Sequence, residues 1–362
     1  MITIATLAGA FVFCYALLSI LISLAPRWGL VDHPGGRKEH SRQTPLVGGL
    51  AIAMTLLFAL ITLRPSFAVP MLIAVCVLLA VGVADDLIEV EPIPKFAMQA
   101  AAGLVMYLMA QVELHFLGDL LGFGAIGLWW FSVPLTVFAV IGVINSMNMA
   151  DGIDGHAGAI ALVAFLAFAF VARESDLWNQ YMMLLVLAGA TAGFLFINMR
   201  SPLVVVARAF LGDAGSMLLG FLIAWFAIDL TQGIDRSLPP VCALWIVVLP
   251  LCDCVSLMIR RKKSGRGMFV ADRQHLHHYL LNRELGVGQA SAVTAGLSVV
   301  TALVGIGGWK LGVPEWVMFA GFVLLFVGYH RFMGHAFKTM PQFSVMPEST
   351  SVMGQLSGKP KG

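Results

Sequence analysis

The sequence predicts an all-α, polytopic membrane protein of about eleven transmembrane helices. Hydrophobic residues make up 59% of the 362 positions and charged residues only 12%, about half the charged fraction typical of a soluble domain. The hydrophobic residues are gathered in long runs, and a membrane-spanning helix needs roughly 20 consecutive, mostly apolar residues. The runs are 3–25, 46–62, 67–84, 95–112, 127–144, 156–172, 178–197, 214–230, 239–259, 288–309 and 313–329.

The polar segments between these runs are too short to form a soluble domain, so we expect one transmembrane domain over residues 1–335. The run 3–25 is too long for a cleaved signal peptide and has no basic segment before it. Residues 336–362 are expected to form a disordered cytoplasmic tail, because the end of the chain is rich in Ser, Pro, Gly and Met.

Lys and Arg residues lie mostly on one side of the predicted bundle. By the positive-inside rule that side is cytoplasmic, which places the N-terminus outside and the C-terminus inside. Of the 22 basic residues, only four lie on the opposite side: Arg64, Arg173, Arg236 and Lys310. The five cysteines all fall within apolar runs, and we expect buried, reduced thiols rather than disulfides or a metal site.

Aspartates stand at or just beyond the ends of alternate runs, which places them together on the predicted cytoplasmic face. A charge at membrane depth costs roughly 2.5–3.5 kcal/mol on insertion scales, so these carboxylates indicate a function. They are Asp85, Asp86, Asp151, Asp154 and Asp213. The alternative is that they are helix-terminal charges in contact with water. Asp253 lies deeper in its run, beside Pro250, and receives no role.

Asp85 and Asp86 are adjacent carboxylates that repel each other, an arrangement that suits a general base or a neighbour of Mg²⁺. Neighbouring residues on a helix point about 100° apart, so we expect these two to have separate partners. In the segment 145–155, Asn and Asp recur every three residues and glycines follow, a density of oxygen donors that fits a hard cation. The alternative there is a plain turn.

Asp213 directly precedes an apolar run between Gly212 and Gly215, where backbone N–H groups could contact a phosphate. The alternative is that its carboxylate caps the following helix. Three histidines within four residues suggest zinc, but no cysteine accompanies them, so donors to a sugar or pyrophosphate are favoured. The basic run 260–263 is a topology signal that can also attract anionic lipid.

Taken together and in this order, these segments resemble the polyprenyl-phosphate N-acetylhexosamine-1-phosphate transferases, glycosyltransferase family 4. The resemblance covers about residues 27–280. The matching motifs are Asp32-x-Pro34-x-x-Arg37-Lys38-x-His40, Asp85-Asp86, Asn145-x-x-Asn148-x-x-Asp151-Gly152-x-Asp154-Gly155, Phe210-x-Gly212-Asp213-x-Gly215-Ser216 and His275-x-His277-His278. Leu276 interrupts the histidines, as in the bacterial undecaprenyl-phosphate GlcNAc-1-phosphate transferase branch. The branch that transfers phospho-MurNAc-pentapeptide carries three consecutive histidines.

The resemblance implies a Mg²⁺-dependent transfer of GlcNAc-1-phosphate from UDP-GlcNAc to undecaprenyl phosphate, with Mn²⁺ as the alternative ion. The active site would lie on cytoplasmic loops at the bacterial inner membrane, and the product would enter an O-antigen-like surface polysaccharide. The alternative donors are UDP-GalNAc and UDP-MurNAc-pentapeptide. The expected partners are these two substrates and membrane lipids, not nucleic acid, and a homodimer is left open. A cation-coupled transporter, with carboxylates near the bilayer midplane, is the alternative of another class.

The resemblance also implies roles for individual residues. The catalytic candidates are Asp85, Asp86 and Asp213, and the metal ligands are Asp213, Asn148 and Asp151. The nucleotide candidates are Gly152, Ile153, Asp154 and Phe210, and the sugar and pyrophosphate candidates are His275, His277, His278 and Arg273. The lipid-phosphate candidates are Lys95, Arg37 and Lys38. A single displacement is favoured over a two-step route through a phospho-enzyme.

Overall fold

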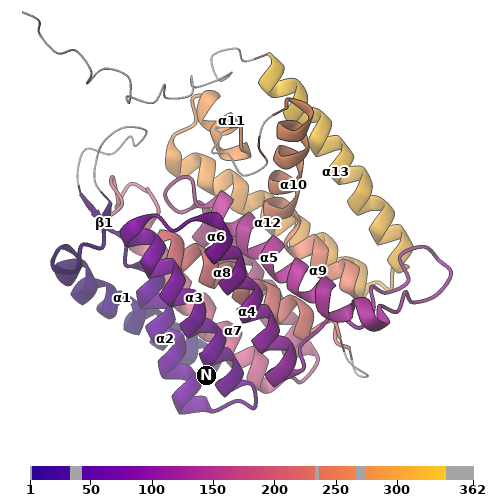
Figure 1. Cartoon of the computed structure of the whole chain (residues 1–362), viewed down its shortest axis with the longest axis horizontal. Coiled ribbons are helices and arrows are strands. Elements are labelled where there is room, and N and C mark those ends of the chain that lie inside the picture. Colours follow the sequence, from indigo (N-terminus) through magenta and orange to yellow (C-terminus); the bar gives the residue numbers. More distant parts are fainter. Residues whose placement is uncertain (1, 33–42, 233–235, 266, 268–273, 340–362) are drawn as a thin grey trace, which may run out of the picture.

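The computed structural model describes residues 2–32, 43–232, 236–265, 267 and 274–339, and it confirms the predicted all-α bundle (Figure 1). In chain order its elements are α1 (Ile2–Trp28), β1 (Val31–Asp32), β2 (Thr44–Pro45), α2 (Gly48–Leu63), α3 (Ala68–Ile88), α4 (Pro92–Ala110), the 3₁₀-helix η1 (Trp129–Phe131), α5 (Ser132–Ala150), α6 (His156–Glu174), α7 (Trp178–Asn198), α8 (Gly212–Asp229), α9 (Pro240–Ile246), α10 (Val248–Lys263), α11 (Leu276–Asn282), α12 (Val287–Lys310) and α13 (Glu315–Lys338).

Every predicted apolar run coincides with helix. Nine helices in the described part of the chain are long and apolar enough to cross a membrane, and α9 with α10 forms a bent tenth candidate. The remaining run, 46–62, is α2, an apolar helix of 16 residues. Helix α13 continues to Lys338, past the predicted domain end at 335, and 340–362 of the predicted tail lie outside the described residues.

The run 239–259 is broken rather than straight. Helices α9 and α10 meet at Val247 and are bent by 81°. Pro250 explains the break, because a proline ring clashes with the carbonyl group four residues earlier and has no N–H to donate to it. That carbonyl belongs to Ile246, the last residue of α9.

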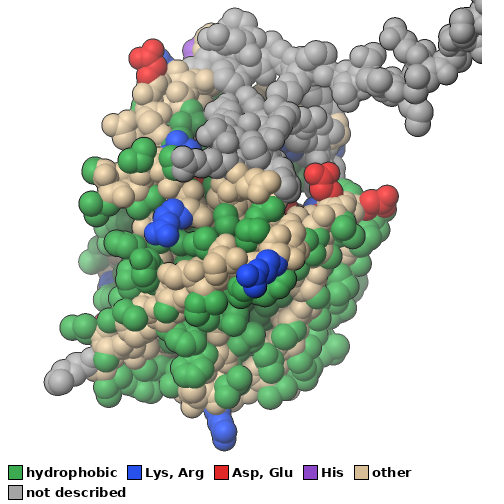
Figure 2. Space-filling model, turned by 90° about the vertical axis from the view of Figure 1, so that its left-hand side faces the viewer, with side chains coloured by type: hydrophobic (Ala, Val, Ile, Leu, Met, Phe, Trp, Pro, Cys, Tyr) green, Lys and Arg blue, Asp and Glu red, His purple; other side chains and the backbone are tan. Residues whose placement is uncertain are grey.

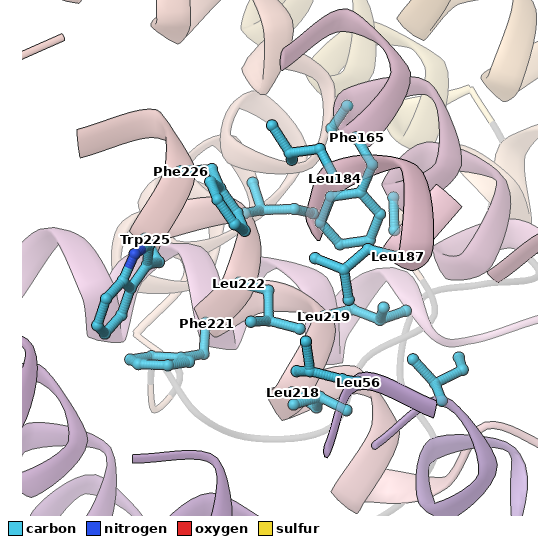
Figure 3. Close-up of a cluster of buried hydrophobic side chains, with 14 of the residues drawn as sticks. Leu56, Phe165, Leu184, Leu187, Leu218, Leu219, Phe221, Leu222, Trp225 and Phe226 are labelled. Atoms are coloured by element: carbon cyan, nitrogen blue, oxygen red, sulfur yellow. The ribbon is translucent and has the colours of Figure 1, made fainter. Parts of the chain in front are cut away.

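Helix α8 lies at the centre of the bundle and α13 at its edge. In the most apolar stretch of α8, 83% of the residues are buried, against 11% in α13. Figure 3 shows part of the surrounding core, in which Trp225 of α8 lies beside Phe221 of the same helix, and Phe165 of α6 lies near Leu184 and Leu187 of α7. The element at the centre of the fold is thus the one that begins with the Gly212-Asp213 motif.

Hydrophobic side chains cover most of the lower body of the face in Figure 2, and its Asp and Glu side chains lie in the upper half. This distribution is expected where lipid tails contact the helices. The prediction of five buried thiols is wrong at one position. Cys76 is exposed on α3, on a surface that would face lipid, whereas Cys14, Cys242, Cys252 and Cys254 are buried, and all five are free.

A short antiparallel pair, β1 with β2, lies at the left edge of Figure 1, α11 lies near the top, and the N label lies near the bottom. The end of β2 and the start of α2 pair with the residue segment that precedes α8. The N–H of Phe210 donates to the carbonyl oxygen of Pro45 at 2.8 Å, and the N–H of Gly48 donates to that of Phe210 at 2.9 Å. The pairing fixes the chain that leads into α8.

Candidate active site

The first turn of α8 is capped by a carboxylate from another helix. The N–H of Asp213 donates to Oδ1 of Asp86 at 2.7 Å, and the N–H of Ala214 donates to Oδ2 at 3.3 Å. The first N–H groups of a helix have no partner within it, and Asp86 satisfies two of them from the end of α3. The alternative in which Asp213 caps its own helix is therefore wrong, and its carboxylate is turned to another partner.

Glycines allow three helices to meet at this point. A Cβ atom on Gly82 of α3 would lie 2.3 Å from the Cα of Ala214, and one on Gly49 of α2 would lie 2.3 Å from the Cα of Gly215. Neither contact is with a flexible side chain, so no larger residue fits without moving backbone. This close approach brings the end of α3 against the start of α8.

Asn148, in the last turn of α5, contacts the carboxylate of Asp213. Its Nδ2 donates to Oδ1 of Asp213 at 2.5 Å and to Oγ of Ser216 at 3.0 Å. Two of the three predicted metal ligands are therefore adjacent, although the motifs that carry them are 65 positions apart.

Asp85 and Asp86 have separate partners, as predicted from their helical spacing. Asp85 is buried, and its Oδ2 accepts from Nζ of Lys95 at 2.7 Å while Oδ1 accepts from the N–H of Val90 at 2.8 Å. Lys95, a predicted phosphate-binding residue, thus enters the site from α4. The Asp85 and Asp213 carboxyl groups are also close enough to interact.

Asp151 follows α5 and joins the same group of charges. Burial first, and then the negative charges of Asp213 and Asp86, raise the pKa of Asp151 well above its ordinary value. Four carboxylates therefore share this end of the bundle with the ammonium group of Lys95. A divalent cation would reduce this excess of negative charge.

The predicted histidines lie directly beside this carboxylate cluster. A Cβ on Gly152 would be 2.3 Å from Nε2 of His277, so only glycine allows the ring this position. The His277 ring lies parallel to that of His275, with centroids 5.3 Å apart, and 4.3 Å from that of His278. Burial and the neighbouring imidazoles hold the pKa of His277 well below its usual range. His156, which was not predicted, lies 5.1 Å from it.

Asp253 holds the histidine segment in place. Its Oδ2 lies 2.8 Å from Nδ1 of His275, and its Oδ1 accepts from the N–H of Leu276 at 3.2 Å and from the hydroxyl of Tyr329 at 2.6 Å. The sequence marked Asp253 as an unexplained buried charge, and no signal in it pointed to partners on α11 and α13.

The predicted nucleotide-binding residues are connected through Asn198, which the sequence analysis did not single out. Its Oδ1 accepts from the N–H of Gly155 at 2.6 Å and its Nδ2 donates to the carbonyl of Ala209 at 2.8 Å, next to Phe210. The carboxylate of Asp154 accepts from Nε of Arg200 at 2.6 Å. The carbonyl of Ile153 accepts from the N–H of His156.

This site offers oxygen donors but not a complete set of side-chain metal ligands in the described residues. No group of three His, Cys, Asp or Glu side chains placed to hold a metal occurs among the residues that the structure describes. Three predicted site residues, Arg37, Lys38 and Arg273, lie outside the described residues.

Comparison with known proteins gives consistent results. The family model described as glycosyl transferase family 4 matches residues 68–231. The chain is 35% identical to the undecaprenyl-phosphate alpha-N-acetylglucosaminyl 1-phosphate transferase of Haemophilus influenzae, over 92% of this chain and 93% of the relative. The proteins of the same name from Pasteurella multocida and Escherichia coli K12 are 36% and 32% identical, over 90% and 93% of this chain and 91% and 93% of their own lengths.

Proposed function

The chain belongs to glycosyltransferase family 4, and on that premise we propose that it transfers GlcNAc-1-phosphate from UDP-GlcNAc to undecaprenyl phosphate, releasing UMP. The observation that supports this proposal most directly is the contact between Asp213 and Asn148 at the start of α8. It places two polar residues of separate motifs beside Asp85 and Lys95, where spans α3, α5 and α8 begin or end. A lipid phosphate at the membrane surface and a soluble nucleotide can both reach such a place.

Mg²⁺ fits the residues present. Mg²⁺ prefers oxygen ligands, keeps several waters, and is commonly held by one or two carboxylates together with substrate phosphates. Asp213, Asn148 and Asp151 would hold it, because they bring oxygen donors into a group of carboxylates with excess negative charge. When bound, the ion would supply charge neutralisation for the diphosphate of the donor substrate.

The reaction needs little help in forming its nucleophile. The second pKa of a phosphate monoester is about 6, so the lipid phosphate is largely dianionic at neutral pH. We propose that its oxygen attacks the β-phosphorus of UDP-GlcNAc and that the bond to UMP breaks in the same step. Lys95, oriented by Asp85, would attract the lipid phosphate, and the neutral His277 would face the sugar side without adding positive charge.

We also propose that this site faces the cytoplasm at the bacterial inner membrane. In Figure 1 the N label lies near the bottom and α11, which directly follows His275, lies near the top, and this arrangement supports an N-terminus outside. UDP-sugars are made in the cytoplasm, so only this orientation gives the site its donor. The orientation is tested by labelling a cysteine introduced at position 2 with a membrane-impermeant thiol reagent in intact cells.

A single assay tests the main proposal. The purified chain is incubated with undecaprenyl phosphate, Mg²⁺ and UDP-GlcNAc, UDP-GalNAc or UDP-MurNAc-pentapeptide, and the lipid product is measured. We expect product with UDP-GlcNAc and its loss in Asp213→Asn. The exposed Asp176→Asn, between α6 and α7, is the matched control and should retain activity. Product from another donor alone would overturn the sugar assignment, and no product from any donor would overturn the reaction.

A second assay tests the single displacement. Labelled UMP and UDP-GlcNAc are incubated with the protein in the absence of lipid acceptor. Direct attack predicts no exchange of label, because no phospho-enzyme forms. Robust exchange would show a two-step route instead.

A further inference from the structure

A basic cleft lies outside the carboxylate and histidine clusters, between the C-terminal ends of α10 and α13. Its volume is about 680 Å³. Arg260, Arg261 and Lys263 line it from α10, and Arg331 and Lys338 line it from α13. The described lining includes no Asp or Glu. Basic side chains on both helices would attract an anion into this cavity.

The cleft lies at the C-terminal end of α13, next to the exposed apolar surface of that helix. Most of α13 is apolar and exposed, with Leu324 at 72% and Phe332 at 47%, as expected of a helix surrounded by lipid tails. Arg331 and Lys338 lie in its last eight residues, and Phe332 is the last large hydrophobic side chain exposed on this helix. Basic side chains at that level are the ones that reach lipid phosphates.

One wall of the cleft is held in place by hydrogen bonds. Arg260 donates from Nη2 to the carbonyl of Gln274 at 2.6 Å and from Nη1 to Oγ of Ser256 at 3.2 Å. Its guanidinium also lies over the ring of Phe337, 5.6 Å from the centroid. These contacts tie the cleft to the residue immediately before His275.

We propose that this cleft binds the phosphate headgroup of an anionic phospholipid, with the acyl chains lying along α13. The bound lipid would join the ends of α10 and α13 and support the segment that leads into the histidine cluster. The proposal concerns a site separate from the catalytic one, and it stands whichever sugar nucleotide the protein uses.

The test measures binding to the full-length protein in zwitterionic micelles. Phosphatidylglycerol, phosphatidylcholine or inorganic phosphate is titrated, and the thermal unfolding midpoint and the number of bound lipids by native mass spectrometry are recorded. Phosphatidylglycerol should raise the thermal midpoint to a plateau as its concentration increases, and phosphatidylcholine should not raise it. In the double variant Arg331→Gln, Lys338→Gln the apparent affinity should fall by about 30-fold, because two surface cations are lost. Both side chains are exposed, so folding should be retained.

The matched control is Arg27→Gln, Lys262→Gln, which removes the same charge from exposed positions near the same surface, outside the cleft. Its affinity for phosphatidylglycerol should equal that of the unsubstituted protein. If both double variants bind phosphatidylglycerol equally weakly, the lipid is attracted by the basic surface in general, and the proposed site is wrong. Equal protection by inorganic phosphate would overturn the lipid in favour of a soluble anion.

Discussion

The backbone N–H of Asp213 donates a 2.7 Å hydrogen bond to the carboxylate of Asp86, a residue 127 positions earlier in the chain. The two aspartates therefore have different tasks. Asp86 holds the start of α8, and Asp213 is left to present its own carboxylate to Asn148. The same contact therefore fixes the start of the helix and the position of the Asp213 carboxylate.

Removing the cap should destabilise the fold. Asp86→Ala leaves two N–H groups of α8 without their partner, and loss of an N-terminal cap costs about 0.5–2 kcal/mol. We expect a lower thermal midpoint in detergent micelles together with reduced transfer. The control is Asp176→Asn, at a position whose side chain is 95% exposed and whose φ of 55° asparagine also tolerates, and it should leave the midpoint unchanged. A midpoint for Asp86→Ala equal to that of the control would refute the capping role.

Removing the charge of Asp213 should affect activity far more than stability. Asp213→Asn keeps an oxygen that can face Asn148 but loses the negative charge that would bind Mg²⁺. A ligand charge of this kind supports several kcal/mol of transition-state stabilisation, so transfer should fall by about 10²–10³-fold with an unchanged thermal midpoint. Activity within twofold or so of the unsubstituted protein would remove Asp213 from the metal site.

The close approach of α3 to α8 can be tested with paired glycine substitutions. Gly82→Ala would place a methyl group against the backbone of Ala214, and such overpacking costs about 1–3 kcal/mol. Gly142→Ala, within α5, meets nothing within 4 Å and should raise stability by about 0.5–1 kcal/mol. Equilibrium unfolding of both variants provides the comparison. Similar effects at both positions would contradict the close packing.

Asp253 should position His275 rather than touch a substrate. Asp253→Asn weakens a buried network that includes His275 and Tyr329, and we expect a loss of about 1–3 kcal/mol in unfolding free energy. The KM for the sugar nucleotide should rise more than kcat falls. Tyr329→Phe removes only one of these hydrogen bonds and should cost about 1 kcal/mol, with a smaller change in KM. A kcat loss without a change in KM would contradict a positioning role.

The raised pKa of Asp151 predicts a pH-dependent penalty in metal-free protein. Because the folded pKa lies above the unfolded value, the folded state disfavours the carboxylate, and stability is lost as the pH rises through the folded pKa. Asp151→Asn removes this penalty. With a chelator present, the thermal midpoint of the variant should therefore rise relative to that of the unsubstituted protein as the pH increases. Mg²⁺ should reduce the difference in midpoint between the two proteins, since metal binding releases the proton from the Asp151 carboxyl group. Parallel pH profiles would contradict the prediction.

The helices could be predicted because their signal is local. Long apolar runs specify membrane spans wherever they occur, and every run coincides with helix. The contact of Asn148 with Asp213 could also be predicted, since both residues lie at span ends on the same predicted side of the membrane. The bend at Val247 was not predicted, although Pro250 was noted, because apolar composition does not distinguish a straight span from a broken one.

The remaining parts of the site depend on contacts between distant segments. The cap on α8 comes from Asp86 in another helix, so the local pattern around Asp213 suggested the wrong capping residue. Asp253 and Tyr329 are 76 positions apart, and nothing near either residue specifies the other. The pairing of 45–48 with Phe210 uses extended segments too short to show a period in the sequence.

Because α8 lies at the centre of the bundle, its place in the chain determines which contacts can form before the later helices are synthesised. Every carboxylate of the cluster, with Asn148 and Lys95, has been translated once α8 is complete at Asp229. The histidine segment and Asp253 follow, and Tyr329 arrives last, on α13. A nascent chain can therefore assemble the carboxylate cluster before the segment 275–278 exists, and α13, the last helix in the described part of the chain, adds the Tyr329 contact to Asp253 that supports this segment.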